Sequence, residues 1–363
     1  MVTRVSNAAV EFAFMPSPKR STSYDVARLA GVSRTTVSLV LNNVPNVHIS
    51  PETRQRILEA AQQLHYYPHA SARRLAQGKT ATVALVWHRG PDADYRDAFL
   101  PALLQGITRA LRAHGYHLIF RPLEPDEPDD AFLELAQGRH ADGLILSGPR
   151  ADSPYLHALH EEGFPLVLHG QLPDSEIPSV DVDNCQGARQ AVEHLIRLGH
   201  RRIGMITNAP LDYVASRQRL EGYRQTLREA GLPVEESLVR IGNFDEESGY
   251  HAMQSLLAQP TPPTAVFVAS DMVAMGALKA VWDRGLRVPD DVAIVGFDDL
   301  AATRFTIPPL TTVRVPAFQL GHETAEQMME IIAHGTPAHP HILLPTSLVV
   351  RASCGAPATS ERR

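Results

Sequence analysis

The stretch TSYDVARLAGVSRTTVSLVLNN, residues 22–43, has the pattern of two short helices joined by a tight turn. Thr22 can cap the first helix, and Asp25 stands three residues later, where its side chain can complete a capping box. Gly31 falls where a chain leaves a helix through a left-handed conformation, which glycine adopts without strain. Ser33 can cap the second helix. The pattern predicts a helix-turn-helix, whose second helix lies in the major groove of DNA. A generic helical hairpin is the alternative, but it requires neither this turn length nor a glycine at this place.

Apolar residues at helical spacing predict a small core around these two helices. They are Val26, Ala27, Leu29 and Ala30 in the first helix, Val32 in the turn, and Val37, Val40 and Leu41 in the second helix, residues 34–41. A third helix is predicted from the cap Ser50 and from Pro51, with Ile57, Leu58, Ala61 and Leu64 facing the core. We therefore expect an all-α headpiece over residues 21–67. A disordered tail, residues 1–20, precedes it, and both Met1 and Met15 are candidate starts of translation.

The charge is divided unevenly along the chain. The 363 residues have a formal net charge of −6, yet residues 1–80 hold ten Lys or Arg and only four Asp or Glu. The other 283 residues hold 24 basic and 36 acidic side chains. A basic head on an acidic body indicates a local DNA-binding module attached to a separate domain.

From residue 82 onward, short apolar runs alternate with amphipathic helical segments. Strands are predicted over 83–87, 116–120, 143–146, 166–169, 203–206, 265–269 and 292–297, and helices over 99–114, 217–230 and 272–284. This alternation predicts βαβ units and parallel sheets covered on both faces. Two such sets predict a two-lobed α/β body with two doubly wound parallel sheets. Ligands of such folds bind at the carboxyl ends of the strands.

Several classes of protein lack their signatures here. Neither a nucleotide-binding glycine motif nor a G-x-S-x-G nucleophile elbow occurs, so no cofactor is expected. Two cysteines, Cys185 and Cys354, form no disulfide framework, which favours a reducing cytoplasm. No apolar run has membrane-spanning length, and the first residues lack a signal-peptide pattern. The histidines lack partners at zinc spacing, so no metal site is expected.

Six motifs resemble those of the lactose/galactose-repressor family of bacterial transcription regulators. They are DVARLAGVSRTTVSLVLN (25–42), ARRLAQGKT (72–80), RLEGY (219–223), SDMVAMGAL (270–278), VGFDD (295–299) and PLTTVRVP (309–316). The resemblance implies a cytoplasmic, nucleoid-associated homodimer that binds a pseudo-palindromic operator under the control of a small effector. It also implies a hinge over residues 68–80 and a body like a periplasmic binding protein. The expected lobes are residues 81–182 with 316–335 and residues 184–314 with 342–351, followed by a tail, 352–363.

The resemblance also assigns DNA contacts. It implies that Arg34 and Thr35 touch base edges, whereas a phosphate contact is the alternative for Arg34. At a third reading position Leu39 offers only an apolar contact. Caps and other DNA contacts are expected from Thr22, Ser33, Thr36, Ser38 and Asn42. In the hinge, Leu75 matches a leucine that wedges into the minor groove, accompanied by Ala72 and Arg73. A solvated linker is the alternative there.

The expected effector site gathers residues at strand ends. They are Phe99, Ser147, His169, Arg217, Arg219, Asp271 and Asp298. An arginine fork and acceptor carboxylates suit a polyol such as a sugar or sugar derivative. A structural role is the alternative for Arg219, and a helix cap is the alternative for Asp271.

Two other classes of function compete with a transcriptional repressor. A solute-binding protein would explain the body but not the headpiece, and an enzyme with a DNA-binding appendage would lack a catalytic motif. The C-terminus has no leucine heptad, which favours a dimer over a tetramer. Release from DNA by the effector and recruitment to DNA are both compatible with this pattern.

Overall fold

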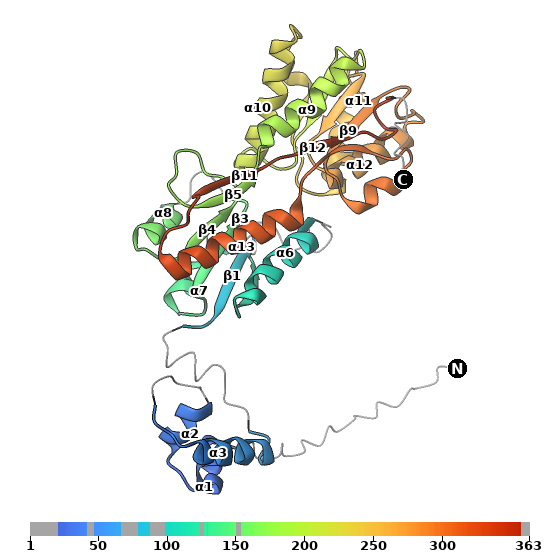
Figure 1. Ribbon diagram of the computed structural model, residues 1–363. Coiled ribbons are helices and arrows are strands. Elements are labelled where there is room, and N and C mark those ends of the chain that lie inside the picture. Colours follow the sequence, from blue (N-terminus) through green and yellow to red (C-terminus); the bar gives the residue numbers. More distant parts are fainter. Residues whose placement is uncertain are drawn as a thin grey trace, which may run out of the picture. The chain divides into compact units, whose positions relative to one another are not determined.

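A computed structural model describes residues 21–41, 47–66, 79–87, 99–123, 127, 128, 130–149 and 154–356. The chain forms two compact units, residues 1–80 and 81–363, which are considered separately (Figure 1). The expected contacts at Asn42, Ala72, Arg73 and Leu75 lie outside the described residues, as do most of the hinge and the N-terminal tail. None of the described helices is long and apolar enough to cross a membrane.

The headpiece contains the three predicted helices, α1 (Ser23–Ala30), α2 (Arg34–Leu41) and α3 (Pro51–Gln63). The capping box is confirmed, because the Thr22 backbone N–H donates to the Asp25 carboxylate at 3.0 Å and the Thr22 hydroxyl accepts from Asp25 N. The left-handed exit after α1 is also confirmed, with φ +66° at Gly31. These local signals determine where α1 begins and ends.

The buried stripe of the headpiece is narrower than expected. Val26, Val37 and Ile57 form its buried centre, but Leu29 is 49% exposed and Leu58 is 45% exposed, so their predicted core positions are wrong. At 3.6 residues per turn, each leucine points roughly 100° away from the middle of its helix's buried stripe. Alanines of α1 and α3 fill the contact positions instead, because three short helices approach closely.

The body contains two six-stranded sheets, which confirms the two-lobed α/β prediction. The first has the order β11-β5-β4-β3-β1-β2 and is parallel throughout. Its strands are β1 (Thr82–Trp87), β2 (His117–Pro122), β3 (Gly143–Ser147), β4 (Leu166–His169), β5 (Ser179–Val182) and β11 (His341–Leu344). The second has the order β12-β10-β9-β8-β6-β7, with only β12 antiparallel. Its strands are β6 (Ile203–Ile206), β7 (Val239–Arg240), β8 (Ala265–Val268), β9 (Ala293–Asp298), β10 (Thr311–Arg314) and β12 (Ser347–Val349).

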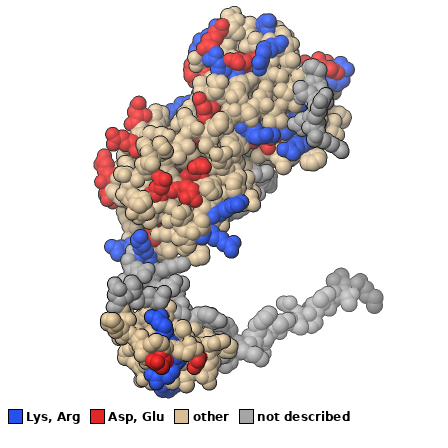
Figure 2. Space-filling model, in the orientation of Figure 1, with Lys and Arg blue, Asp and Glu red and all other residues tan. Residues whose placement is uncertain are grey.

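Helices cover both faces of each sheet, as a doubly wound fold requires. The first lobe has α6 (Phe99–Ala113) and α13 (Ala317–His334) on one face, and α7 (Leu133–Gln137) and α8 (Pro154–Glu161) on the other (Figure 1). The second lobe has α9 (Asn184–Arg197) and α10 (Val214–Glu229) on one face, and α11 (Glu246–Leu257) and α12 (Asp271–Asp283) on the other. On the face drawn in Figure 2, acidic side chains gather over the first lobe.

The chain passes between the lobes three times, after β5, after β10 and after β11. The last crossing corrects an expected boundary, which placed residues 342–344 in the second lobe. They belong to the first, because β11 pairs in parallel with β5, with Leu344 opposite Val182. A short apolar run at a sheet edge carries no information about which of two sheets it joins.

Candidate functional site

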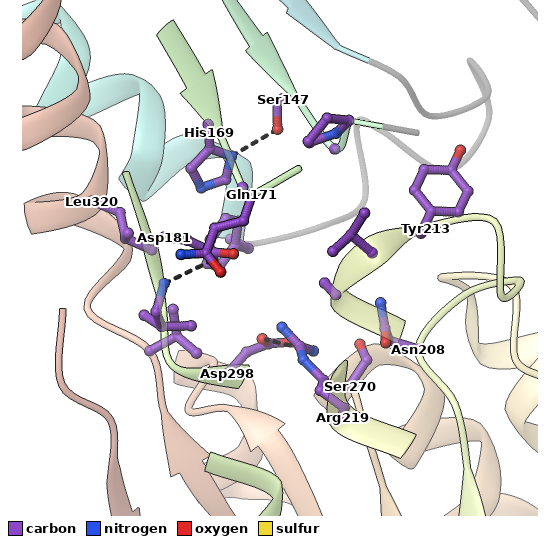
Figure 3. Close-up of a pocket in the computed structure, with 18 of the residues that line it drawn as sticks. Ser147, His169, Gln171, Asp181, Asn208, Tyr213, Arg219, Ser270, Asp298 and Leu320 are labelled. Carbon is purple, nitrogen blue, oxygen red and sulfur yellow. Dashed lines mark hydrogen bonds and ion pairs between the residues drawn. The ribbon is translucent and has the colours of Figure 1, made fainter. Parts of the chain in front are cut away.

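A pocket opens between the lobes at the carboxyl ends of their strands and encloses about 820 Å³ of empty space, part of it open to solvent. The first lobe contributes Phe99, Ser147, Gly148, Pro149, His169, Gly170, Gln171, Asp181, Val182 and Leu320. The second contributes Asn208, Tyr213, Val214, Ala215, Arg219, Phe244, Ser270, Asp298 and Val315. Figure 3 shows His169 and Asp298 on opposite sides of this space. A molecule in the pocket would therefore touch both lobes at once.

One wall is built from the ends of two neighbouring strands. Ser147 ends β3 and His169 ends β4, and the two are opposite each other in the parallel ladder. A hydrogen bond of 2.8 Å joins the Ser147 hydroxyl to His169 Nδ1. The His169 ring lies nearly parallel to buried Trp87, with 6.4 Å between ring centroids, and it is 6.0 Å from the Phe99 ring. This wall thus combines an imidazole and a hydroxyl with an aromatic surface.

Arg219, on α10, lies on the opposite wall and is held by several contacts. Its Nε donates to the Asn184 side-chain oxygen at 2.9 Å, and one terminal nitrogen donates to the Ala269 carbonyl at 2.6 Å. The guanidinium carbon lies 3.8 Å from the centre of the Phe297 ring, a cation–π contact. The same terminal nitrogen is 4.0 Å from an Asp298 oxygen. These contacts fix the guanidinium in one position.

Asp298 is presented by an unusual backbone. The residue has φ +123° and the next, Asp299, has φ +58°, which are rare conformations for side chains with a Cβ. The nearly buried Asp299 carboxylate forms ion pairs with Arg351 and with Arg314, the latter at 2.7 Å. The Asp298 carbonyl also accepts from the Val315 N–H at 3.3 Å. The surrounding ion pairs and backbone contacts therefore hold the turn that aims Asp298 into the pocket.

Asp181, which was not predicted from the sequence, is a buried carboxylate on the pocket wall. Its oxygens accept from Val182 N at 2.7 Å and from the Asn184 side-chain nitrogen at 3.1 Å. Burial raises the pKa of Asp181 to about 6, although the Val182 N–H, Arg219 and Asn184 oppose that rise. Asp181 is an interior residue of a fully buried strand segment, SVDV. A carboxylate inside such a run was the signal that could have identified it.

Polar and aromatic side chains complete the pocket. The Asn184 amide donates to Gln218 at 3.0 Å, and the Gln218 amide donates to Gln171 at 3.1 Å, so hydrogen bonds connect the two lobes. Tyr213 and Phe244 form an edge-to-face pair 5.0 Å apart. These two aromatic residues follow strands in irregular segments, where the sequence has no periodicity that would indicate their direction.

Two residues expected at the site are not on it. Arg217 is exposed and does not line the pocket, whereas Arg219 does. Two residues along an α-helix are turned by roughly 200°, so the two arginines face opposite ways. Asp271 is completely buried behind the pocket, where it accepts from the Thr312 hydroxyl at 2.7 Å and from Leu300 N at 2.9 Å. Burial first, and then the nearby Asp298 charge, raise the pKa of Asp271 well above its ordinary range. It braces the turn after β9, and Ser270 takes the helix-cap position.

The second headpiece helix presents the expected polar surface. Arg34, Thr35 and Ser38 are exposed, whereas Leu39 is half-buried. The Ser33 hydroxyl accepts from Thr36 N at 3.1 Å and is 2.9 Å from the Thr36 hydroxyl, so both side chains serve the cap. Thr22 is bonded within its capping box. The exposed start of α2 thus carries an arginine and a hydroxyl that project from the headpiece. Their contacts with DNA stay predictions.

Among the described residues, no group of three or more His, Cys, Asp or Glu side chains is arranged to hold a metal ion. The arrangement described above consists of hydrogen-bond donors, acceptors and aromatic rings around a cavity. Such a lining is suited to hold a small polar molecule.

Comparison with known proteins covers both units. The family model for bacterial regulatory proteins of the lacI family matches residues 22–69, and the model for a periplasmic binding protein-like domain matches residues 192–354. The HTH-type transcriptional regulator CelR of Thermobifida fusca is 37% identical over 342 residues, which cover 93% of this chain and 100% of CelR.

Two solved structures are similar over nearly the whole chain. A transcriptional regulator CelR–cellobiose complex is 36% identical, with a TM-score of 0.71, over 92% of this chain and 100% of that one. A lac repressor dimer bound to operator and the anti-inducer ONPF is 28% identical, with a TM-score of 0.83, over 93% of this chain and 100% of that one. The chain belongs to the lacI family of bacterial regulatory proteins and is a DNA-binding transcriptional regulator.

Proposed function

We propose that this regulator is a repressor that binds a pseudo-palindromic operator as a homodimer and responds to a sugar or sugar derivative bound between its lobes. The pocket carries the proposal, because its walls come from both lobes and combine Arg219, Asp298 and aromatic rings. Carboxylates accept from hydroxyl groups, and aromatic rings pack against the apolar face of a sugar. A related regulator, CelR, has been solved as a cellobiose complex, which supports a sugar in this pocket.

The same proposal assigns the headpiece its contacts. Arg34 and Thr35 read base edges, and the hydroxyl residues around them position the protein on phosphates. Leu75 enters the minor groove at the centre of the operator. This part of the proposal rests on the exposed start of α2 and on the resemblance of the hinge motif.

Exposed apolar side chains on the second lobe support the homodimer. Trp282 on α12 is 72% exposed, and Phe305 and Ile307 after β9 are 84% and 89% exposed. Exposed apolar side chains mark a surface that another protein covers where they lie together in one patch. We assign them to contacts with a second copy of the chain. The protein acts in the cytoplasm on chromosomal DNA, and its body binds a ligand without transforming it.

Operator binding tests the proposal directly. The full-length protein is mixed with labelled DNA from the region upstream of its own gene, and sugars are added to the complex. We expect one specific site and its release or recruitment by a sugar. A thermal-shift screen identifies the sugar, because a ligand at 100 times its dissociation constant adds ~2.7 kcal/mol. Absence of any specific site would refute the operator assignment.

Two arginine variants test the site. Arg219→Ala is expected to abolish the sugar response while operator binding persists, because the fixed guanidinium beside Asp298 is lost from the pocket wall. Arg217→Ala is the matched control, since Arg217 lies on the same helix but faces solvent. Calorimetry that gives wild-type sugar affinity for Arg219→Ala, or a lost response in Arg217→Ala, would contradict the assignment.

A further inference from the structure

We propose that the pocket selects an uncharged polyhydroxyl effector and rejects the counterpart that carries a carboxylate or a phosphate. This inference rests on the proposed function of the pocket as an effector site. It names the chemical class of the effector more narrowly than a sugar or sugar derivative.

The charges on the pocket wall favour this class. Among the described residues that line the pocket, the formally charged side chains are Asp181, Arg219 and Asp298. The wall thus holds two carboxylates and one guanidinium. A third carboxyl group, that of Asp271, is completely buried and lies close enough for the Asp298 charge to raise its pKa.

The guanidinium is already engaged by the protein. Its Nε donates to Asn184 and one terminal nitrogen donates to the Ala269 carbonyl, while its face lies over the Phe297 ring. Binding a carboxylate or phosphate through an arginine fork needs two parallel N–H donors on one edge. The edge formed by Nε cannot pair in this way without breaking the bond to Asn184, which also holds Asp181.

The carboxylates of Asp181 and Asp298 favour a neutral ligand over an anionic one. Hydroxyl groups of a neutral ligand can donate to them, whereas an anionic group would meet like charges in a partly desolvated site. Like-charge contacts of this kind weaken the binding of a wrong partner. The pKa of Asp181 is already raised by burial, so a second negative charge nearby would add to an existing penalty.

The test uses matched pairs of sugars on the full-length protein bound to operator DNA. The pairs are glucose with glucuronate, galactose with galacturonate, and cellobiose with its uronic-acid form, together with glucose 6-phosphate. Ionic strength is held constant, and calorimetry on the free protein accompanies operator release. We expect a neutral member to bind and its charged counterpart to bind roughly 100-fold more weakly or worse.

Two aspartate variants locate the selectivity. Asp181→Asn removes one carboxylate from the pocket wall. In the sugar pair whose neutral member binds, it should reduce the affinity difference between the neutral and the charged sugar, which we call the gap. Asp174→Asn is the matched control, because Asp174 is exposed with φ +54°, a conformation that asparagine tolerates. It should leave the gap unchanged.

Three results would overturn the proposal in distinguishable ways. A charged member that binds as tightly as its neutral partner refutes the selectivity but leaves the regulator with a sugar effector. An equal gap in wild type and Asp181→Asn refutes the role of that carboxylate and, with it, the charge argument. Failure of every sugar, with operator binding intact, removes the sugar effector itself and this inference together.

Discussion

The buried carboxylate of Asp181 should make the stability of the body depend on pH. Burial raises its pKa from 3.8 to about 6 in the folded protein, so the folded state binds the proton more tightly than the unfolded state does. Because the folded state binds this proton more tightly, protonation of Asp181 contributes to the free energy of unfolding. That contribution is fully present below pH 3.8 and is lost as the pH rises through about 6. The difference between the two pKa values corresponds to about 3 kcal/mol of unfolding free energy, since each tenfold change in proton affinity is worth about 1.36 kcal/mol.

Asp181→Asn removes the titration but keeps the shape. An asparagine oxygen can still accept from Val182 N, while its amide would face the Asn184 amide, a mismatch that adds a constant offset. Urea unfolding of wild type and variant is measured from pH 4 to pH 7.5. The free energy of unfolding of wild type minus that of the variant should fall by about 2 kcal/mol between pH 4 and pH 6 and level off near pH 7.

A conservative change at the exposed Glu176, Glu176→Gln, is measured alongside as the control for the removal of a carboxylate. The reasoning is refuted if the Asp181→Asn difference is independent of pH. It is equally refuted if that difference rises with pH, because a rising difference would mean a folded-state pKa below 3.8.

Three further changes have defined outcomes. Gly276→Ala would place a Cβ 1.7 Å from the Glu246 carbonyl oxygen, so α11 and α12 must separate; a loss of about 1–3 kcal/mol or more in urea unfolding is expected, and an unchanged midpoint would show that the helices can move freely. Thr22→Ala removes the capping box and should lower headpiece stability by ~1 kcal/mol, seen as faster amide hydrogen exchange in α1. Leu75→Ala should leave the fold intact but weaken operator binding and reduce DNA bending; wild-type bending would remove the wedge assignment.

The headpiece could be predicted from sequence because its determinants are local. Thr22, Gly31, Ser33 and Ser50 each act within four residues of their own position, and all four are found as caps or turns. Leu29 failed because the width of a buried stripe depends on how closely neighbouring helices approach. That distance depends on the tertiary structure, and the spacing of apolar residues along one helix does not reveal it.

The body was predicted where strands are wholly apolar. Strands β4 and β6 were assigned with their observed bounds, because LVL of β4 and IGMI of β6 are buried apolar runs. Strand β5 was missed, since Asp181 interrupts its apolar pattern, and β10 was missed because three of its four residues are polar. Buried threonines there bond to neighbouring groups, which the sequence alone does not reveal.

The site was predicted in part for the same reason. Phe99, Ser147, His169, Arg219 and Asp298 line the pocket, since strand ends and the start of a helix already indicate position along the chain. The errors at Arg217 and Asp271 concern direction. The direction in which the Arg217 side chain points depends on the exact first residue of α10, which begins at Val214 rather than at the expected residue 217. The direction of the Asp271 side chain depends on the turn after β9, which encloses it.

The pocket and the lobe crossings share residues, so an occupant of the pocket would contact the backbone that joins the lobes. Val182 lines the pocket and ends the strand before the first crossing, and Val315 lines it within the second. Asp298 is tied to that second crossing by its carbonyl bond to Val315 and through the adjacent Asp299–Arg314 ion pair. A ligand that pulls on Asp298 therefore acts on backbone where the chain passes between lobes. We expect these crossings to act as hinges, which convert small local shifts into movements of whole domains.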